Sequence, residues 1–211
     1  MSNFKKQKYL IIKKAISTDM ANFIYGYFSF KRRVAKKFFD ERYISPFTKE
    51  WGVWNDEQVP NTYSHYSDIV METLLERVRP KIEKETKLKL IPTYSFARLY
   101  KTGDVLKRHK DRFSCEISAT MFLGGESWEL YIEPSGQENK KGIKVIQKSG
   151  DMLIYSGCEL EHWREKFKGK QCIQVFLHYN NRKTPGSKDN MFDKRPHLGL
   201  PEWYKGFKLP K

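Results

Sequence analysis

The chain has 211 residues, of which 39% are hydrophobic and 15% aromatic, and its formal net charge at pH 7 is +15. This length and composition predict one folded domain with a substantial core and exclude a disordered chain. No apolar run is long enough to span a membrane, and the run at 9–12 is too short for a secretion signal. Because the three cysteines have no zinc-like spacing and suit a reducing compartment, we expect a cytoplasmic protein.

The positive charge is concentrated at the two ends of the chain. Residues 1–50 contain twelve basic and four acidic residues, and residues 181–211 contain eight and three. The middle, 51–180, is close to balance, with twenty basic and eighteen acidic residues. Two interpretations stay open: a solubilising surface, or long-range attraction to an acidic or nucleic-acid partner.

The chain begins with a predicted strand and a long helix. The strand lies at 8–13, where an apolar run is flanked by lysines. The helix is predicted from Thr18 to Phe39, after Ser17 as N-cap, because apolar residues recur there at helical spacing. Gly26 and Ser29 suggest a break in this helix.

An irregular segment and a second helix follow. Residues 42–65 combine two tryptophans with proline and glycine, which predicts either a lid or binding loop or a segment packed over a sheet edge. The second helix begins after Ser67-Asp68. Pro80 inside its pattern either kinks the helix or ends it near Arg79.

The next part of the chain carries half of a predicted metal site. A strand at 94–100, a turn and a second extended segment lead to His109 and Asp111. Residues two apart on a strand point to the same side, so these two can present a nitrogen and an oxygen to one ion. A third ligand must come from elsewhere, and the best candidate is His162.

The remaining chain predicts short strands separated by glycine-rich turns. The strands lie at 115–123, 128–133, 143–147 and 152–155, the last leading to the segment with His162. Such regularly spaced strands favour a closed or double-sheet architecture, so the predicted class is mainly β with flanking helices (α+β). From Asn181 onward, proline and glycine predict a surface tail with little regular structure.

Taken together, these motifs resemble a known family. Two histidines and one carboxylate with open positions opposite form the facial triad of non-haem Fe(II) oxygenases. The sequence reads F-x-R-x-Y-x-x-G-x-x-x-x-x-H-x-D, then S-G-D-M-L-I-Y, G-C-x-L-x-H-W-R-E and Q-V-F-L-H-Y. This pattern, over about residues 94–180, resembles the 2-oxoglutarate/Fe(II) dioxygenases of the prolyl 4-hydroxylase-like type, above all the small stand-alone members of bacteria and phages.

The resemblance implies a fold and a division of the chain. It implies a double-stranded β-helix (jelly roll, cupin-like) core supported by N-terminal helices, as a single dioxygenase domain over 1–211. Residues 1–90 would be helical support and loop, 91–180 the catalytic β-roll, and 181–211 an irregular basic tail.

It also implies cofactors and their contacts. His109, Asp111 and His162 would hold Fe(II), with 2-oxoglutarate and O2 as cosubstrates and ascorbate as an optional reductant. The far carboxylate of 2-oxoglutarate needs a cation and hydroxyl donors. Two cations compete for this role: Arg164, whose planar fork suits a carboxylate, and Lys170, at the start of the final strand. Among hydroxyl donors, Tyr100 resembles the family's cosubstrate tyrosine, and Thr120 or Ser118 could add another.

Three functions stay in view. The favoured one is hydroxylation of a C–H bond, of a prolyl or other side chain in a protein or peptide, with decarboxylation of 2-oxoglutarate to succinate and CO2. A nucleic-acid demethylase of the same superfamily would use the basic flanks, but the chain lacks the paired arginines those enzymes carry well beyond the second histidine. The third is a non-catalytic, metal-binding β-roll that serves as a basic docking module.

Overall fold

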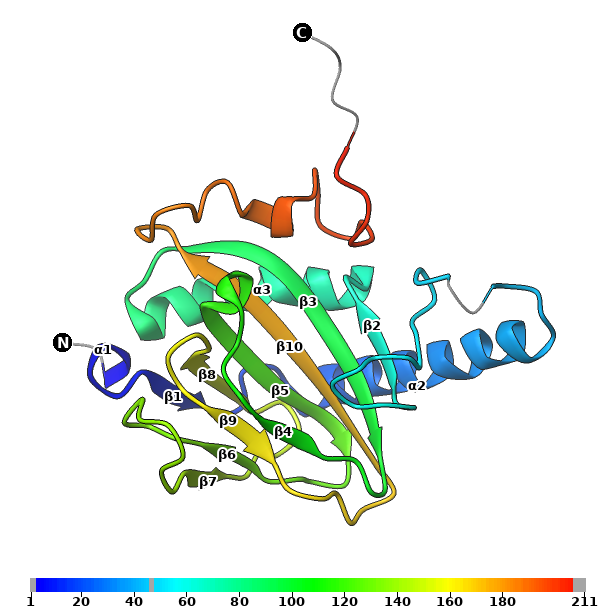
Figure 1. Ribbon diagram of the computed structural model, residues 1–211, viewed down its shortest axis with the longest axis horizontal. Coiled ribbons are helices and arrows are strands. Elements are labelled where there is room, and N and C mark those ends of the chain that lie inside the picture. The colour runs from blue at the N-terminus through cyan, green and yellow to red at the C-terminus, as the bar shows by residue number, and fades with distance from the viewer. Residues whose placement is uncertain (1–2, 46–47, 207–211) are drawn as a thin grey trace, which may run out of the picture.

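The computed structural model describes residues 3–45 and 48–206, and its centre is a pair of antiparallel sheets. The six-stranded sheet has the order β1-β8-β5-β10-β3-β2, and the four-stranded sheet has the order β4-β9-β6-β7 (Figure 1). The strands are β1 (Tyr9–Ile12), β2 (Tyr63–Tyr66), β3 (Leu90–Lys101), β4 (Leu106–His109), β5 (Ile117–Gly125), β6 (Leu130–Ile132), β7 (Ile143–Val145), β8 (Met152–Ser156), β9 (His162–Arg164) and β10 (Gln171–Asn181). The predicted α+β class with a jelly-roll core is confirmed.

Alternation along the strands separates a structural face from a functional face. On β3, Ala97 and Leu99 enter the large apolar core that includes the buried residues of the helices. Arg98 and Tyr100 point to the opposite face, between the two sheets. The interior of the roll therefore holds polar side chains beside a smaller apolar cluster, while the helices stabilise the outer face of the six-stranded sheet.

Two long helices cover that outer face: α2 (Thr18–Asp40) and α3 (Ile69–Thr86) (Figure 1). The predicted break in α2 is wrong: the helix runs unbroken because its buried face, including Ile24 and Phe28, packs against the sheet on both sides of Gly26. Pro80 does not end α3, because Val78 and Ile82 on either side of it are buried in the core.

Several short segments differ from the expectation in detail. A short helix, α1 (Asn3–Gln7), was not predicted, and Phe113–Cys115 forms a 3₁₀ turn (η1) before β5. The tail has little regular structure beyond η2 (Met191–Lys194), as predicted, but it is firmly anchored. Arg195 in the tail is buried and pairs with buried Glu72 of α3 at 2.9 Å. Across the described ranges, no helix has both the length and the hydrophobicity to cross a membrane.

Candidate active site

The structure brings together the three predicted metal ligands. His109 ends β4 and His162 begins β9, and the two are direct partners in the antiparallel pairing of these strands. Their rings lie 4.2 Å apart between centroids. Asp111 follows β4, and its Oδ1 lies 3.6 Å from Nε2 of His109 and 3.5 Å from Nε2 of His162. Three ligand atoms of the kind that Fe(II) accepts thus face one point.

Backbone carbonyls fix the orientation of both imidazoles. Nδ1 of His109 lies 2.7 Å from the carbonyl of Lys107, and Nδ1 of His162 lies 3.1 Å from the carbonyl of Leu160. Since a carbonyl only accepts, each Nδ1 carries a proton, which leaves Nε2 as the nitrogen that can bind a metal when the ring is neutral. Burial, followed by the neighbouring His162, lowers the pKa of His109, which favours the neutral ring that a metal requires.

A hydrogen-bonded chain holds the carboxylate from the other side. The Ser118 hydroxyl donates to Asp111 Oδ2 at 2.8 Å and lies 3.0 Å from Nδ1 of His178. Burial raises the pKa of Asp111, but His162 and the Ser118 hydroxyl outweigh it, so the net pKa lies below the usual range. Burial lowers the pKa of His178 to about 4. His178 was not expected in the site. It lies close to Asp111 because His178 of β10 pairs with Ser118 of β5, and the sequence does not reveal this pairing.

The deep end of the roll contains a buried cation without a carboxylate. Arg164 lies on β9 two residues after His162, is 0% exposed and stacks over the Trp128 ring at 5.0 Å. One Nη donates to the Trp128 carbonyl, and the other lies 3.3 Å from the Gln174 oxygen in the amide orientation that satisfies its neighbours. Its Nε has no hydrogen-bond partner in the described ranges, and no described carboxylate pairs with it. An unpaired buried guanidinium is costly, so this environment suits an anionic ligand.

Lys170, the alternative cation, lies in a different environment. Its side chain is exposed, just before β10, and its backbone N–H donates to Glu126 Oε1 at 2.6 Å. An exposed ammonium is satisfied by water and gains little from a carboxylate. The geometry therefore distinguishes two cations that sequence spacing alone did not separate.

The three predicted hydroxyls all lie inside the roll. Tyr100 is 0% exposed, and its oxygen accepts from Arg98 Nη1 at 3.2 Å. Because one lone pair is used in this way, its O–H remains free to donate elsewhere. Thr120 lies 3.2 Å from the Gln174 amide, whereas the Ser118 hydroxyl is already engaged with the Asp111 carboxylate. Tyr100 and Thr120 are thus the better placed donors for a cosubstrate.

His109, Asp111 and His162, the three candidate ligands, line a cavity of about 340 Å³, which we call the metal cavity. Its wall includes Arg98 and two side chains from the irregular segment before β2, Asp56 and Gln58. The Gln58 amide lies 3.1 Å from His109 Nε2. This contact supports the interpretation of the segment as a lid or binding loop. No sequence pattern indicated it.

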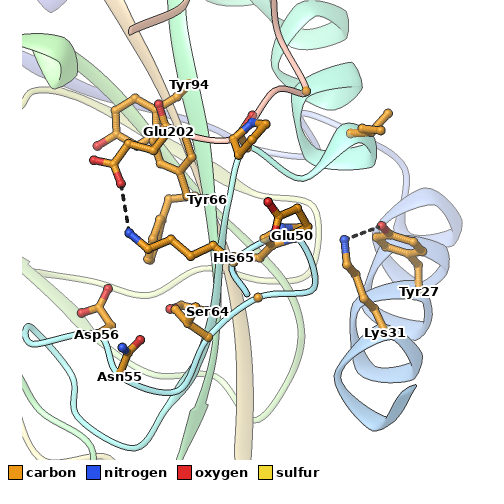
Figure 2. Close-up of a pocket in the computed structure, with 18 of the residues that line it drawn as sticks. Tyr27, Lys31, Glu50, Asn55, Asp56, Ser64, His65, Tyr66, Tyr94 and Glu202 are labelled. Carbon is orange, nitrogen blue, oxygen red and sulfur yellow. Dashed lines mark hydrogen bonds and ion pairs between the residues drawn. The ribbon is translucent and has the colours of Figure 1, made fainter. Parts of the chain in front are cut away.

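A second cavity, of about 640 Å³, adjoins the first, and we call it the outer cleft (Figure 2). It lies between Tyr27 and Lys31 of α2 and the Tyr66–Tyr94 ring pair, whose centroids are 4.8 Å apart. The residues that line both cavities are Asp56, Tyr94, Phe96 and Arg112. A ligand could therefore extend from the metal cavity along aromatic walls into the outer cleft.

The fold is shared with solved oxygenases, although no protein-family model and no curated protein sequence matches the chain. A Pseudomonas putida prolyl-4-hydroxylase superposes with a TM-score of 0.60 at 15% identity, over 85% of this chain and 96% of that one. HygX from Streptomyces hygroscopicus, with nickel and 2-oxoglutarate bound, gives 0.58 at 13% identity, over 85% of each chain.

A viral collagen prolyl hydroxylase from Paramecium bursaria Chlorella virus-1, in complex with 2-oxoglutarate, gives a TM-score of 0.55 at 12% identity. The match covers 84% of this chain and 98% of that one. HygX has also been solved with nickel, 2-oxoglutarate and hygromycin B bound. The chain has the fold of the 2-oxoglutarate- and Fe(II)-dependent oxygenases.

Proposed function

We propose that this protein is a 2-oxoglutarate- and Fe(II)-dependent dioxygenase that hydroxylates a C–H bond. One observation carries the proposal: the same short strand, β9, contributes the ligand His162 and the buried, carboxylate-free Arg164. Residues two apart on a strand lie roughly 6–7 Å apart, which suits a cosubstrate held by a metal at one end and a cation at the other.

The residues would divide the work as follows. His109, Asp111 and His162 would hold Fe(II), which would supply O2 activation coupled to decarboxylation of 2-oxoglutarate to succinate and CO2. Arg164 binds the far carboxylate, with Tyr100 and Thr120 as hydroxyl donors, while the exposed Lys170 is the less suited alternative. Trp128 and the neighbouring apolar side chains exclude water from this carboxylate. Ascorbate would keep the iron reduced.

For the primary substrate, we propose a side chain of a protein or peptide, with proline the first candidate. The support comes from the outer cleft, whose cations are already paired. The pairs are Lys31–Asp68 at 2.5 Å, Lys49–Glu202 at 3.7 Å and Arg112–Asp193 at 2.8 Å. A nucleic-acid strand needs free cations for its phosphates, whereas an extended peptide needs aromatic and hydrogen-bonding walls. The balanced charge therefore favours a peptide over the demethylase alternative.

Succinate formation tests the proposal. Purified protein with Fe(II), ascorbate and 2-oxoglutarate should release succinate, and Asp111→Ala should abolish this release while the fold persists. Mass spectrometry of cell proteins exposed to the wild type, but not to the variant, should then show the gain of one oxygen atom. Wild-type protein that neither binds nor consumes 2-oxoglutarate would refute the proposal.

A further inference from the structure

A second buried guanidinium lies at the level of the three candidate metal ligands. Arg98 is 2% exposed, follows Phe96 on the inner face of β3, and lines the metal cavity. Two residues further on, Tyr100 reaches toward Trp128, over which Arg164 stacks. The two arginines therefore stand at different depths of the roll, Arg98 beside the metal ligands and Arg164 at the closed end.

The partners of Arg98 come mainly from a loop. Its Nη2 pairs with Asp56 Oδ2 at 2.9 Å, and its Nη1 donates to the side-chain Oε1 of Gln58 at 3.1 Å and to the Tyr100 hydroxyl at 3.2 Å. Its Nε has no hydrogen-bond partner in the ranges that the structure describes. Asp56 and Gln58 belong to the irregular segment before β2, whereas Arg98 sits on the central sheet. The guanidinium is thus fixed, and its carboxylate partner is on the more adaptable element.

The same loop segment occupies space beside the metal ligands. The Gln58 amide lies 3.1 Å from Nε2 of His109, which is the nitrogen that faces the metal position. The Asp56 carboxylate therefore contacts Arg98, and the neighbouring Gln58 amide contacts His109. A ligand with a carboxylate and a neighbouring carbonyl oxygen could make contacts similar to those of the Asp56 carboxylate and the Gln58 amide.

We infer that Arg98 binds the carboxylate next to the keto group of the cosubstrate, at the opposite end from Arg164. Asp56 and Gln58 hold Arg98 until the cosubstrate arrives and then move aside. A dicarboxylate would thus meet one guanidinium at each end, with its keto acid end toward the metal. This inference rests on the proposed function. A carboxylate on the primary substrate offers the same chemistry, and binding measurements without that substrate distinguish the two.

Two keto acids separate the roles of the arginines. Mn²⁺-loaded protein, kept free of oxygen, would be titrated calorimetrically with 2-oxoglutarate and with 2-oxovalerate, which has the same keto acid end but no far carboxylate. Arg98→Gln should weaken both ligands by a similar factor of about tenfold or more, because both carry the carboxylate it loses. Arg164→Gln should weaken 2-oxoglutarate selectively.

A variant in the loop should change the affinity for 2-oxoglutarate in the opposite direction, so the inference can still be tested if Arg98→Gln misfolds. Asp56→Asn removes the competing carboxylate and should tighten 2-oxoglutarate binding several-fold. Glu57→Gln makes the same charge change at an exposed neighbouring residue and should have no effect. Unchanged affinity in both Arg98→Gln and Asp56→Asn, or selective loss of 2-oxoglutarate in Arg98→Gln, would overturn the inference. Wild-type protein that binds Mn²⁺ but not 2-oxoglutarate would refute the proposed function itself, and this inference with it.

Discussion

Arg164→Met should separate stability from cosubstrate binding. The substitution forfeits charged hydrogen bonds to Trp128 and Gln174, each about 1.5–3 kcal/mol, but it also removes the desolvation cost of an unpaired buried ion, which is several kcal/mol. These contributions oppose each other, so the unfolding free energy of the ligand-free protein should change by less than about 2 kcal/mol. Binding should suffer far more, because a desolvated carboxylate left without its cation costs about 2–5 kcal/mol, or roughly 30-fold to several thousand-fold.

Thermal unfolding of Mn²⁺-loaded protein with and without 2-oxoglutarate measures both effects. A ligand at a hundred times its dissociation constant stabilises the wild type by about 2.7 kcal/mol. If the variant binds a hundredfold more weakly, the same concentration stabilises it by only about 0.4 kcal/mol. Lys170→Met is the matched control and should retain the full ligand-induced shift, because Lys170 is exposed. The reasoning fails if Arg164→Met unfolds the protein yet leaves the ligand-induced shift intact, or if Lys170→Met abolishes that shift.

Three further predictions follow from the site and its support. Ser118→Ala removes the donor to Asp111 and should weaken Co²⁺ binding about 10- to 100-fold in a competition titration, and unchanged affinity would show that this hydrogen bond does not position the ligand. Gly157→Ala would place its Cβ 2.5 Å from Asp111 Oδ2, so it should lower both the metal affinity and the stability of the protein. Gly26→Ala has open space around it and should stabilise α2 by up to about 1 kcal/mol in chemical denaturation. Equal effects of the two substitutions on stability would contradict the packing around these glycines. Burial raises the pKa of Asp68, but His65 and Lys31 together outweigh burial and hold this pKa below its usual value. The stability that Asp68 contributes is therefore present above its pKa in the unfolded chain and is lost as the pH falls. The unfolding free energy should drop below about pH 4, and this drop should be less steep in Asp68→Asn.

Local patterns predicted the parts of the site that lie close together in sequence. His109 and Asp111 could be paired because a strand places residues two apart on one side. The number and spacing of the strands predicted a closed or double-sheet architecture, and the resemblance specified it as a jelly roll. His162 was already the best candidate for the third ligand, and the resemblance implied the same role. His109 and His162 are direct partners across β4 and β9, and this tertiary pairing could not be predicted from the spacing of residues along the sequence.

Residues that act through tertiary contacts could not be predicted. Gln58 and Asp56 come from a segment without periodicity, and only the folded loop brings them to Arg98 and His109. His178 reaches the carboxylate through Ser118 because β10 lies beside β5. Helix α3 passes through Pro80 because burial on both sides of the proline outweighs its local penalty, a balance that local propensity does not capture.

A crystal structure of the protein soaked with Mn²⁺ and 2-oxoglutarate under nitrogen tests the central claim most directly. We expect one anomalous peak bonded to Nε2 of His109, Nε2 of His162 and a carboxylate oxygen of Asp111, at about 2.0–2.3 Å. The far carboxylate of 2-oxoglutarate should lie on Arg164. A peak away from these three side chains, or a cosubstrate held at the exposed Lys170, would contradict the account.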